Sequence, residues 1–150
     1  MRKVAVSACL LGYNCKYNGK NNLDPKLKEL LSHCEVLPVC PEMEGGLPAP
    51  RIPCEIVGDR VLDRNGTDRT EAYEEGVAAA LQRMEEEGID TVIVQPRSPS
   101  CGKLKIYDGT FTGHLIPGSG KFAKMAMKKG LNVLEPEEIS RCHAFKNVLE

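Results

Sequence analysis

The 150-residue sequence has no tryptophan, only 5% aromatic residues and a formal net charge of -1. Because Lys and Arg balance Asp and Glu, the chain offers no general attraction to nucleic acid or to an anionic membrane surface. Few aromatic side chains are present on which single-stranded nucleic acid could stack. No apolar run approaches a membrane span, and the short apolar stretch after Lys3 is typical of a strand. We therefore expect a cytoplasmic protein without a membrane or stable nucleic-acid partner, and leave its oligomeric state open.

The sequence also lacks any C-x-x-C pair, although it contains seven cysteines. An intracellular chain keeps its thiols reduced, and an odd number of cysteines cannot all form disulfides. Seven thiols in a chain of this length therefore favour metal, cluster or thiol chemistry. The missing pair argues against a closed zinc site and against a thioredoxin-like redox site, since both usually contain such a pair.

Strand and helix patterns alternate along the chain. Apolar, β-branched runs predict strands, and apolar residues at helical spacing predict helices between them. A Gly-Asp turn between residues 57 and 60 predicts a small hairpin, and the four prolines of residues 41–53 predict a long loop. This alternation predicts one domain over residues 1–150, a three-layer, mostly parallel α/β sheet flanked by helices, Rossmann-like, with a small hairpin. The predicted strands cover residues 3–8, 35–39, 91–94 and 132–134, and the predicted helices cover residues 24–33, 68–88, 121–129 and a segment from 136.

Three cysteines follow predicted strands that are far apart in the sequence. Cys9 and Cys40 come directly after strands, and Cys101 comes a few residues after a third. The carboxyl ends of parallel strands lie at one edge of a sheet, which is where such folds bind ligands. Three thiolates at that edge could hold an iron–sulfur cluster with one iron left open. Ordinary buried cysteines, a zinc-stabilised binding module and a thiol redox protein remain alternatives at this point.

The segments around these cysteines resemble the thiouracil desulfidase family. The resemblance extends from about Val4 to Val133, and its motifs occur in the family's order. The segments that carry it are Ser7-Ala8-Cys9-Leu10-Leu11-Gly12, Tyr17-Asn18-Gly19, Pro38-Val39-Cys40-Pro41-Glu42, Gly45-Gly46-Leu47-Pro48, Arg51, Val61-Leu62-Asp63, Arg97-Ser98-Pro99-Ser100-Cys101-Gly102, Ile106-Tyr107-Asp108-Gly109 and Gly113-His114-Leu115-Ile116-Pro117-Gly118.

The resemblance implies a 4Fe-4S cluster that removes sulfur from a thiolated nucleobase without net redox change. Carried over to this sequence, it implies Cys9, Cys40 and Cys101 as cluster ligands. It also implies Glu42 and Ser98 as the catalytic acid/base and substrate-contacting residues. The expected reaction releases sulfide and converts a thiocarbonyl to a carbonyl, with a small thiolated base or nucleoside as substrate.

Ser7, Ser100 and Arg97 lie in the matched segments, and we expect them to bind the substrate. Ser-Pro-Ser is also ordinary turn chemistry, so the residues alone do not decide which serine faces the substrate. Cys54 is a second candidate for the middle cluster ligand. We favour Cys40 because Pro41-Glu42 follows it.

Overall fold

The computed structural model describes residues 2–141. Within that range, strands and helices alternate as the sequence predicts. None of the described helices is long and apolar enough to cross a membrane. The elements are β1 (Arg2–Ser7), the 3-10 helix η1 (Ala8–Leu11), α1 (Pro25–Leu30), β2 (Cys34–Val39), α2 (Pro41–Glu44), β3 (Cys54–Val57), β4 (Arg60–Asp63), α3 (Thr70–Glu86), β5 (Thr91–Ile93), β6 (Lys105–Tyr107), β7 (Leu115–Pro117), α4 (Lys121–Lys128), β8 (Asn132–Leu134) and α5 (Pro136–Arg141).

The main sheet is parallel, with strand order β2-β1-β5-β8. The central strand β1 pairs with β2 along its whole length, from Arg2 opposite Cys34 to Ser7 opposite Val39. Its residues Val4, Ala5 and Val6 have no exposed surface, because helices cover both faces of the sheet. Such double burial explains why the strand appears in the sequence as a continuous apolar run.

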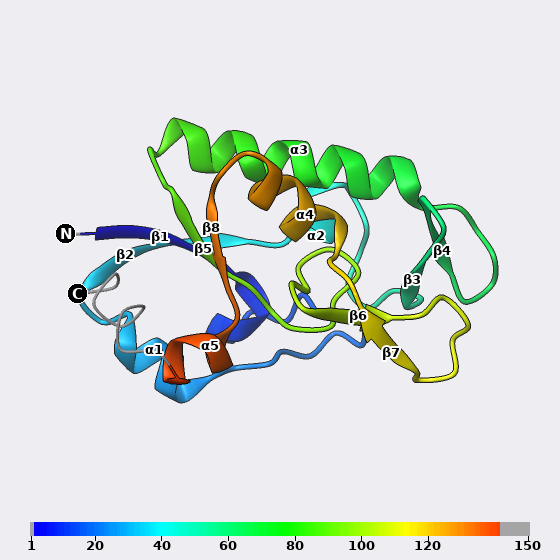
Figure 1. Cartoon of the computed structure of the whole chain (residues 1–150), viewed down its shortest axis with the longest axis horizontal. Coiled ribbons are helices and arrows are strands. Elements are labelled where there is room, and N and C mark those ends of the chain that lie inside the picture. The colour runs from blue at the N-terminus through cyan, green and yellow to red at the C-terminus, as the bar shows by residue number, and fades with distance from the viewer. Residues whose placement is uncertain (1, 142–150) are drawn as a thin grey trace.

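Helices cover the sheet on two sides, α3 and α4 on one face and α1 and α5 on the other (Figure 1). Apolar residues of α3 and α4 pack with Ala5 and Val92 in one core cluster. Leu27 of α1 and Ile139 of α5 pack with Val6 in a second cluster on the opposite face. The predicted three-layer α/β architecture is therefore present.

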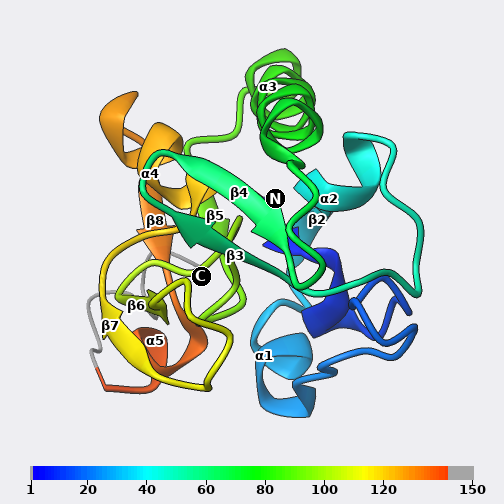
Figure 2. The same ribbon diagram turned by 90° about the vertical axis from the view of Figure 1, so that its right-hand side faces the viewer.

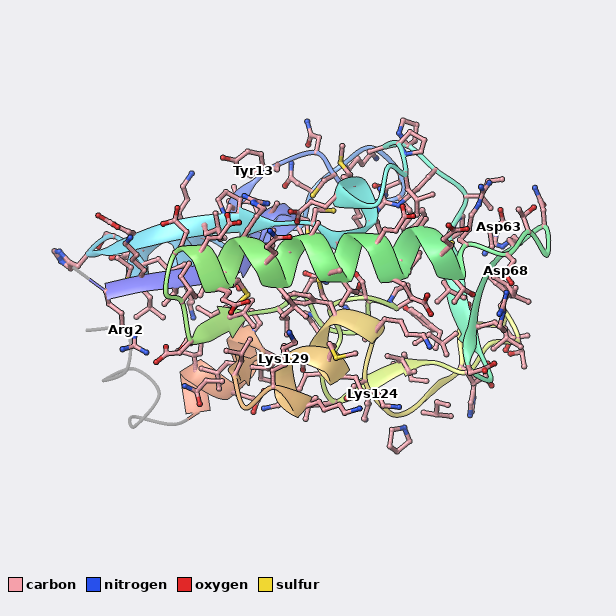
Figure 3. The ribbon with its side chains drawn as sticks, turned by 90° about the horizontal axis from the view of Figure 1, so that it is seen from above. Arg2, Tyr13, Asp63, Asp68, Lys124 and Lys129 are labelled. Atoms are coloured by element: carbon pink, nitrogen blue, oxygen red, sulfur yellow. The ribbon has the colours of Figure 1, made fainter. Side chains whose placement is uncertain are left out.

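Two antiparallel hairpins stand at the carboxyl end of the parallel strands. The β3–β4 hairpin was predicted, and it lies across that end of the molecule in Figure 2. Asp63 and Asp68 mark this end in Figure 3, while Arg2 lies at the opposite end of the sheet. The β6–β7 hairpin, paired through Ile106 and Ile116, was not predicted as a hairpin. Together the hairpins extend the molecule beyond the strand ends.

The expectation of an unbroken loop over residues 41–53 is wrong, because Pro41–Glu44 forms one turn of helix, α2. Pro41 occupies the first turn, where a missing backbone N–H removes no helical hydrogen bond. The Glu44 carboxylate then accepts the backbone N–H of Cys40 at 3.1 Å. This turn determines the direction of the chain directly after Cys40.

Candidate functional site

A cavity of about 560 Å³ lies at the carboxyl end of the parallel sheet. Its lining comes from the ends of β1 and β2, from the loops after β5 and β6, and from the first hairpin. The walls of the cavity are therefore formed by the carboxyl edge of the sheet and by both hairpins. Five cysteines line the cavity: Cys9, Cys15, Cys40, Cys54 and Cys101.

The three predicted cluster ligands come from three neighbouring strands. Cys9 lies in η1 directly after β1, Cys40 is the N-cap residue of α2 after β2, and Cys101 lies in the loop after β5. Because β2, β1 and β5 are adjacent and parallel, their ends bring all three residues to one cavity. The convergence expected from the sequence is therefore found, while cluster ligation by these residues stays a prediction.

Burial and mutual contact keep several of these thiols protonated. Burial raises the pKa of Cys101 well above its usual range, and the nearby Glu42 carboxylate raises it further. The pKa of Cys40 is raised first by its hydrogen bond with Cys15 and then by burial. For Cys15, the hydrogen bond with Cys40 lowers the pKa, but the hydrogen bond with Cys9, together with burial, outweighs it and brings the pKa to about 11. A metal centre binding here must therefore displace thiol protons.

The surroundings of Cys40 and Cys54 differ. Cys40 contacts Cys15, and Glu42 lies 3.7 Å from its sulfur. Cys54 instead has Tyr73 as its side-chain hydrogen-bond partner, and its sulfur lies 3.7 Å from the carbonyl oxygen of Ile52. Cys40 thus belongs to the thiol group near the strand ends, and Cys54 belongs to the hairpin side of the cavity. This difference supports Cys40 as the middle ligand.

Glu42 is a buried carboxylate within this cavity, with only 7% of its surface exposed. Its Oε1 accepts a hydrogen bond of 2.6 Å from the Ser100 hydroxyl and lies 3.5 Å from the Ser98 hydroxyl. Its Oε2 faces the sulfur of Cys40. Among the described residues Glu42 forms no salt bridge, and its side-chain partners are the hydroxyls of Ser98 and Ser100 and the thiol of Cys40.

The two serines of the loop after β5 have different positions. The Ser98 hydroxyl accepts the backbone N–H groups of Ser100 and Cys101 at 3.1 and 3.0 Å, and Ser98 also lines the cavity. Ser100 has no exposed surface and donates to Glu42 from behind the cavity lining. Ser98 is thus placed to reach a bound molecule, whereas Ser100 orients the carboxylate.

Ser7 and Arg97 both line the cavity. Ser7 is buried at the end of β1, and its hydroxyl accepts the backbone N–H of Gln95 at 3.0 Å. Arg97 has a positive φ of 68° and pairs with Ile106 through a parallel bridge. That bridge connects the loop that contains Cys101 with β6 of the second hairpin.

Close backbone contact between α2 and α3 positions Glu42. A Cβ atom at Gly76 would lie 1.7 Å from the carbonyl oxygen of Pro41, and one at Gly45 would lie 1.9 Å from that of Ala72. Glycine is therefore required at both contact points for the helices to pack this closely. Arg83 of α3 adds a 2.6 Å salt bridge to Glu44 at the end of α2.

Among residues 2–141, no group of three or more His, Cys, Asp or Glu side chains could hold a single metal ion. A four-iron cluster has a different requirement, one thiolate for each ligated iron, arranged around a cavity large enough for the cluster. The soft thiol donors of Cys9, Cys40 and Cys101 around one cavity fit that requirement.

Several cavity residues were missed by sequence reasoning. Cys15 lies outside the matched motifs, yet it hydrogen bonds with both Cys9 and Cys40. Glu55 and Phe111 come from the two hairpins, and their contact joins residues far apart in the sequence. The Asp-Gly turn after Tyr107 was the available signal for the second hairpin. Nothing in the local sequence identified Glu55.

Fold and cavity define an α/β protein with a thiol-rich site at the carboxyl end of its parallel sheet. The chain belongs to the 2-thiouracil desulfurase family, whose model matches residues 4–138. This confirms the family predicted from the sequence.

Two individual proteins are similar over nearly the whole chain. The uncharacterized protein YbbK of Bacillus subtilis (strain 168) is 36% identical over 147 residues, which cover 91% of this chain and 97% of YbbK. The solved structure of the 4Fe-4S-dependent thiouracil desulfidase TudS is 33% identical and covers 99% of both chains with a TM-score of 0.91. That likeness confirms the predicted fold, and the 4Fe-4S cofactor on which TudS depends is the one predicted from this sequence.

Proposed function

We propose that this protein is a 4Fe-4S-dependent desulfidase that releases sulfide from a small thiolated nucleobase or nucleoside. The observation that carries the proposal is the arrangement of Cys9, Cys40 and Cys101 at three adjacent strand ends, in one cavity with the buried carboxylate of Glu42. Family membership supports this reaction and argues against the two alternatives, a zinc-stabilised binding module and a thiol redox protein.

In this proposal, Cys9, Cys40 and Cys101 would hold the cluster. The bound cluster supplies an iron with an open position, a Lewis acid with affinity for a thiocarbonyl sulfur. Cys101 is buried, and Cys9 and Cys40 are each partly buried at the cavity. Proton transfer and substrate binding are assigned to carboxylate, hydroxyl and guanidinium side chains of the chain.

Glu42 is the proposed acid/base residue. Replacing a thiocarbonyl sulfur by oxygen requires water to add at carbon and to transfer its protons as hydrogen sulfide leaves. The buried Oε2 of Glu42 faces the thiol side of the cavity, where it can accept a proton from that water. Ser100 holds the other oxygen by its 2.6 Å hydrogen bond, so the carboxylate keeps one orientation.

Ser98, Ser7 and Arg97 are the proposed substrate contacts, because all three line the cavity. Hydroxyl and guanidinium groups can hydrogen bond to the carbonyl and ring nitrogens of a pyrimidine. For Ser100, whose side chain is fully buried, we propose a positioning role through Glu42 in place of direct substrate contact.

The wider setting follows from the same observations. The six described cysteines form no disulfide, which supports a reducing, cytoplasmic setting. The family match spans most of the chain and supports its assignment to one desulfidase domain. A cavity of about 560 Å³ has the size of a small-molecule site, which favours a small substrate and gives no reason to expect a stable nucleic-acid partner.

Sulfide release from 2-thiouracil and 4-thiouracil tests the proposal. The anaerobically reconstituted protein should produce one equivalent of sulfide for each equivalent of uracil, without an added electron donor or acceptor. Glu42→Gln keeps the size and the acceptor oxygen of the side chain but removes its basicity, so we expect kcat to fall by about 10²- to 10⁴-fold. Glu71→Gln, on the exposed part of α3, is the matched control and should keep full activity. No sulfide release from either compound would contradict the proposal.

A further inference from the structure

The loop between β6 and β7 carries an aromatic residue into the cavity in an unusual backbone conformation. Phe111 lines the cavity and has a φ of 59°. Among the described residues, it shares a positive φ only with Arg97 and a set of glycines, and Arg97 also lines the cavity. Aromatic residues rarely adopt this conformation, and such outliers concentrate at functional sites.

A buried carboxylate from the other hairpin holds this loop in place. Glu55 of β3 is only 8% exposed, and its Oε1 accepts the backbone N–H groups of Gly109 at 2.9 Å and of Phe111 at 3.1 Å. Asp108 adds hydrogen bonds to the backbone and side chain of Thr110 inside the loop. Glu55 therefore holds the backbone of Phe111 directly, and Asp108 holds the residue before it.

Phe111 also differs chemically from the other residues around it. Most of the lining is thiol, hydroxyl, carboxylate or cationic. Tyr17, another aromatic residue of the lining, is 45% exposed, and the Lys16 ammonium lies 5.9 Å from its ring centroid. Tyr73 is buried beneath the cavity with 2% exposure, and Tyr107 of β6, which also lines the cavity, carries a polar hydroxyl on its ring. Phe111 thus combines an apolar aromatic face, a place in the lining and a backbone held by tertiary contacts.

We propose that Phe111 is a specificity-determining residue whose ring stacks on the planar ring of the thiolated substrate, and that Glu55 is the positioning residue that holds it there. The inference rests on the proposed function and names its binding contact. A pyrimidine presents a flat π-face, and aromatic side chains stack on such faces largely independently of the ring substituents. The stack would orient the thiocarbonyl edge toward the thiol side of the cavity.

Kinetics of the cluster-loaded enzyme with 2-thiouracil, together with calorimetric binding of uracil, test the proposal. Phe111→Leu keeps an apolar side chain but removes the aromatic face. It should raise KM and the uracil Kd by about 5- to 150-fold, with kcat little changed, because stacking contributes equally to the ground and transition states. Phe111→Tyr should restore both values. Tyr13→Leu is the matched control, since Tyr13 is 55% exposed, lies outside the cavity lining and stands at the outer edge of the molecule (Figure 3).

Phe111→Gly separates stacking from folding. Glycine adopts a positive φ freely, so this variant should keep or raise the melting temperature while losing substrate affinity as Phe111→Leu does. Glu55→Gln should raise KM in the wild-type background but add nothing in the Phe111→Leu background, since its effect passes through the ring. A purely structural role for Glu55 would instead raise KM by the same factor in both backgrounds.

Two negative results have different meanings. If the wild type releases sulfide and binds uracil, but Phe111→Leu and Phe111→Gly match it in KM and Kd, the stacking role is overturned while the proposed function stands. If the wild type neither releases sulfide nor binds uracil, the proposed function fails and the inference fails with it.

Discussion

Gly76→Ala tests whether the packing of α2 on α3 positions the carboxylate of Glu42. The added Cβ would lie 1.7 Å from the carbonyl oxygen of Pro41, whereas real Cβ contacts essentially never fall below 3.0 Å. α2 and α3 must therefore move apart by at least 1.3 Å at this contact, the difference between those distances. Both atoms in this clash belong to backbone or to Cβ, so a change of side-chain rotamer cannot relieve it.

The displacement acts on Cys40 and Glu42 together, because both lie at the start of α2. A misplacement of about 1 Å can reduce a rate by about 100-fold even when it originates away from the chemistry. We therefore expect kcat/KM for 2-thiouracil to fall by about 100-fold. Overpacking should also lower the free energy of unfolding by about 1 to 3 kcal/mol, less the helix-propensity gain of alanine over glycine.

The assay is sulfide release per iron-loaded protein, alongside thermal unfolding of each variant. Glu75→Ala is the matched control, since the neighbouring residue points outward on the same helix and should keep full activity. Gly45→Ala, whose Cβ would lie 1.9 Å from the carbonyl oxygen of Ala72, should reproduce the defect from the other side of the contact. Full activity and unchanged stability in both glycine variants would refute the reasoning.

Two further predictions concern the serines and the thiols. Ser100→Ala removes the 2.6 Å hydrogen bond to the buried Glu42 carboxylate, so kcat should fall by about 10- to 100-fold with iron content unchanged. Ser98→Ala should lower the melting temperature more than Ser100→Ala does, because the backbone N–H groups of Ser100 and Cys101 lose their acceptor. Equal melting temperatures of the two variants would contradict this prediction. In the metal-free protein, the pKa values of Cys40 and Cys101 lie above the ordinary 9.0. Because the thiolate is the form that reacts, the alkylation rate of both residues should still increase with pH at pH 9.0. Peptide mass spectrometry after iodoacetamide treatment measures those rates, and a plateau below pH 9.0 would be the contrary result.

The parallel sheet was predictable because its strands are buried on both faces. Val4, Ala5 and Val6 form a continuous apolar run, and the run around Val92 does the same for β5. Once the strands were placed, parallel topology alone brought Cys9, Cys40 and Cys101 to one edge. Local pattern and a general rule of α/β folds thus sufficed for the sheet and for the main features of the site.

The features that were missed depend on contacts between distant segments. The contact of Gly76 with Pro41, and that of Glu55 with Phe111, each join residues whose local sequence contains no sign of the partner. The second hairpin was missed because its strands have only three residues each, too short for an alternating pattern to be recognised. Cys15 was left aside because it belongs to no matched motif, although it hydrogen bonds with two of the predicted ligands.

The most direct test of the central claim is the iron and acid-labile sulfide content of anaerobically reconstituted protein, measured for the wild type and for single cysteine-to-alanine variants. The wild type should contain about four irons and about four sulfides per chain. Cys9→Ala, Cys40→Ala and Cys101→Ala should each lose most of that iron, while Cys54→Ala, from the hairpin side of the same cavity, should retain it. Full iron content in Cys40→Ala together with loss in Cys54→Ala, or a wild type that takes up no iron, would contradict the account.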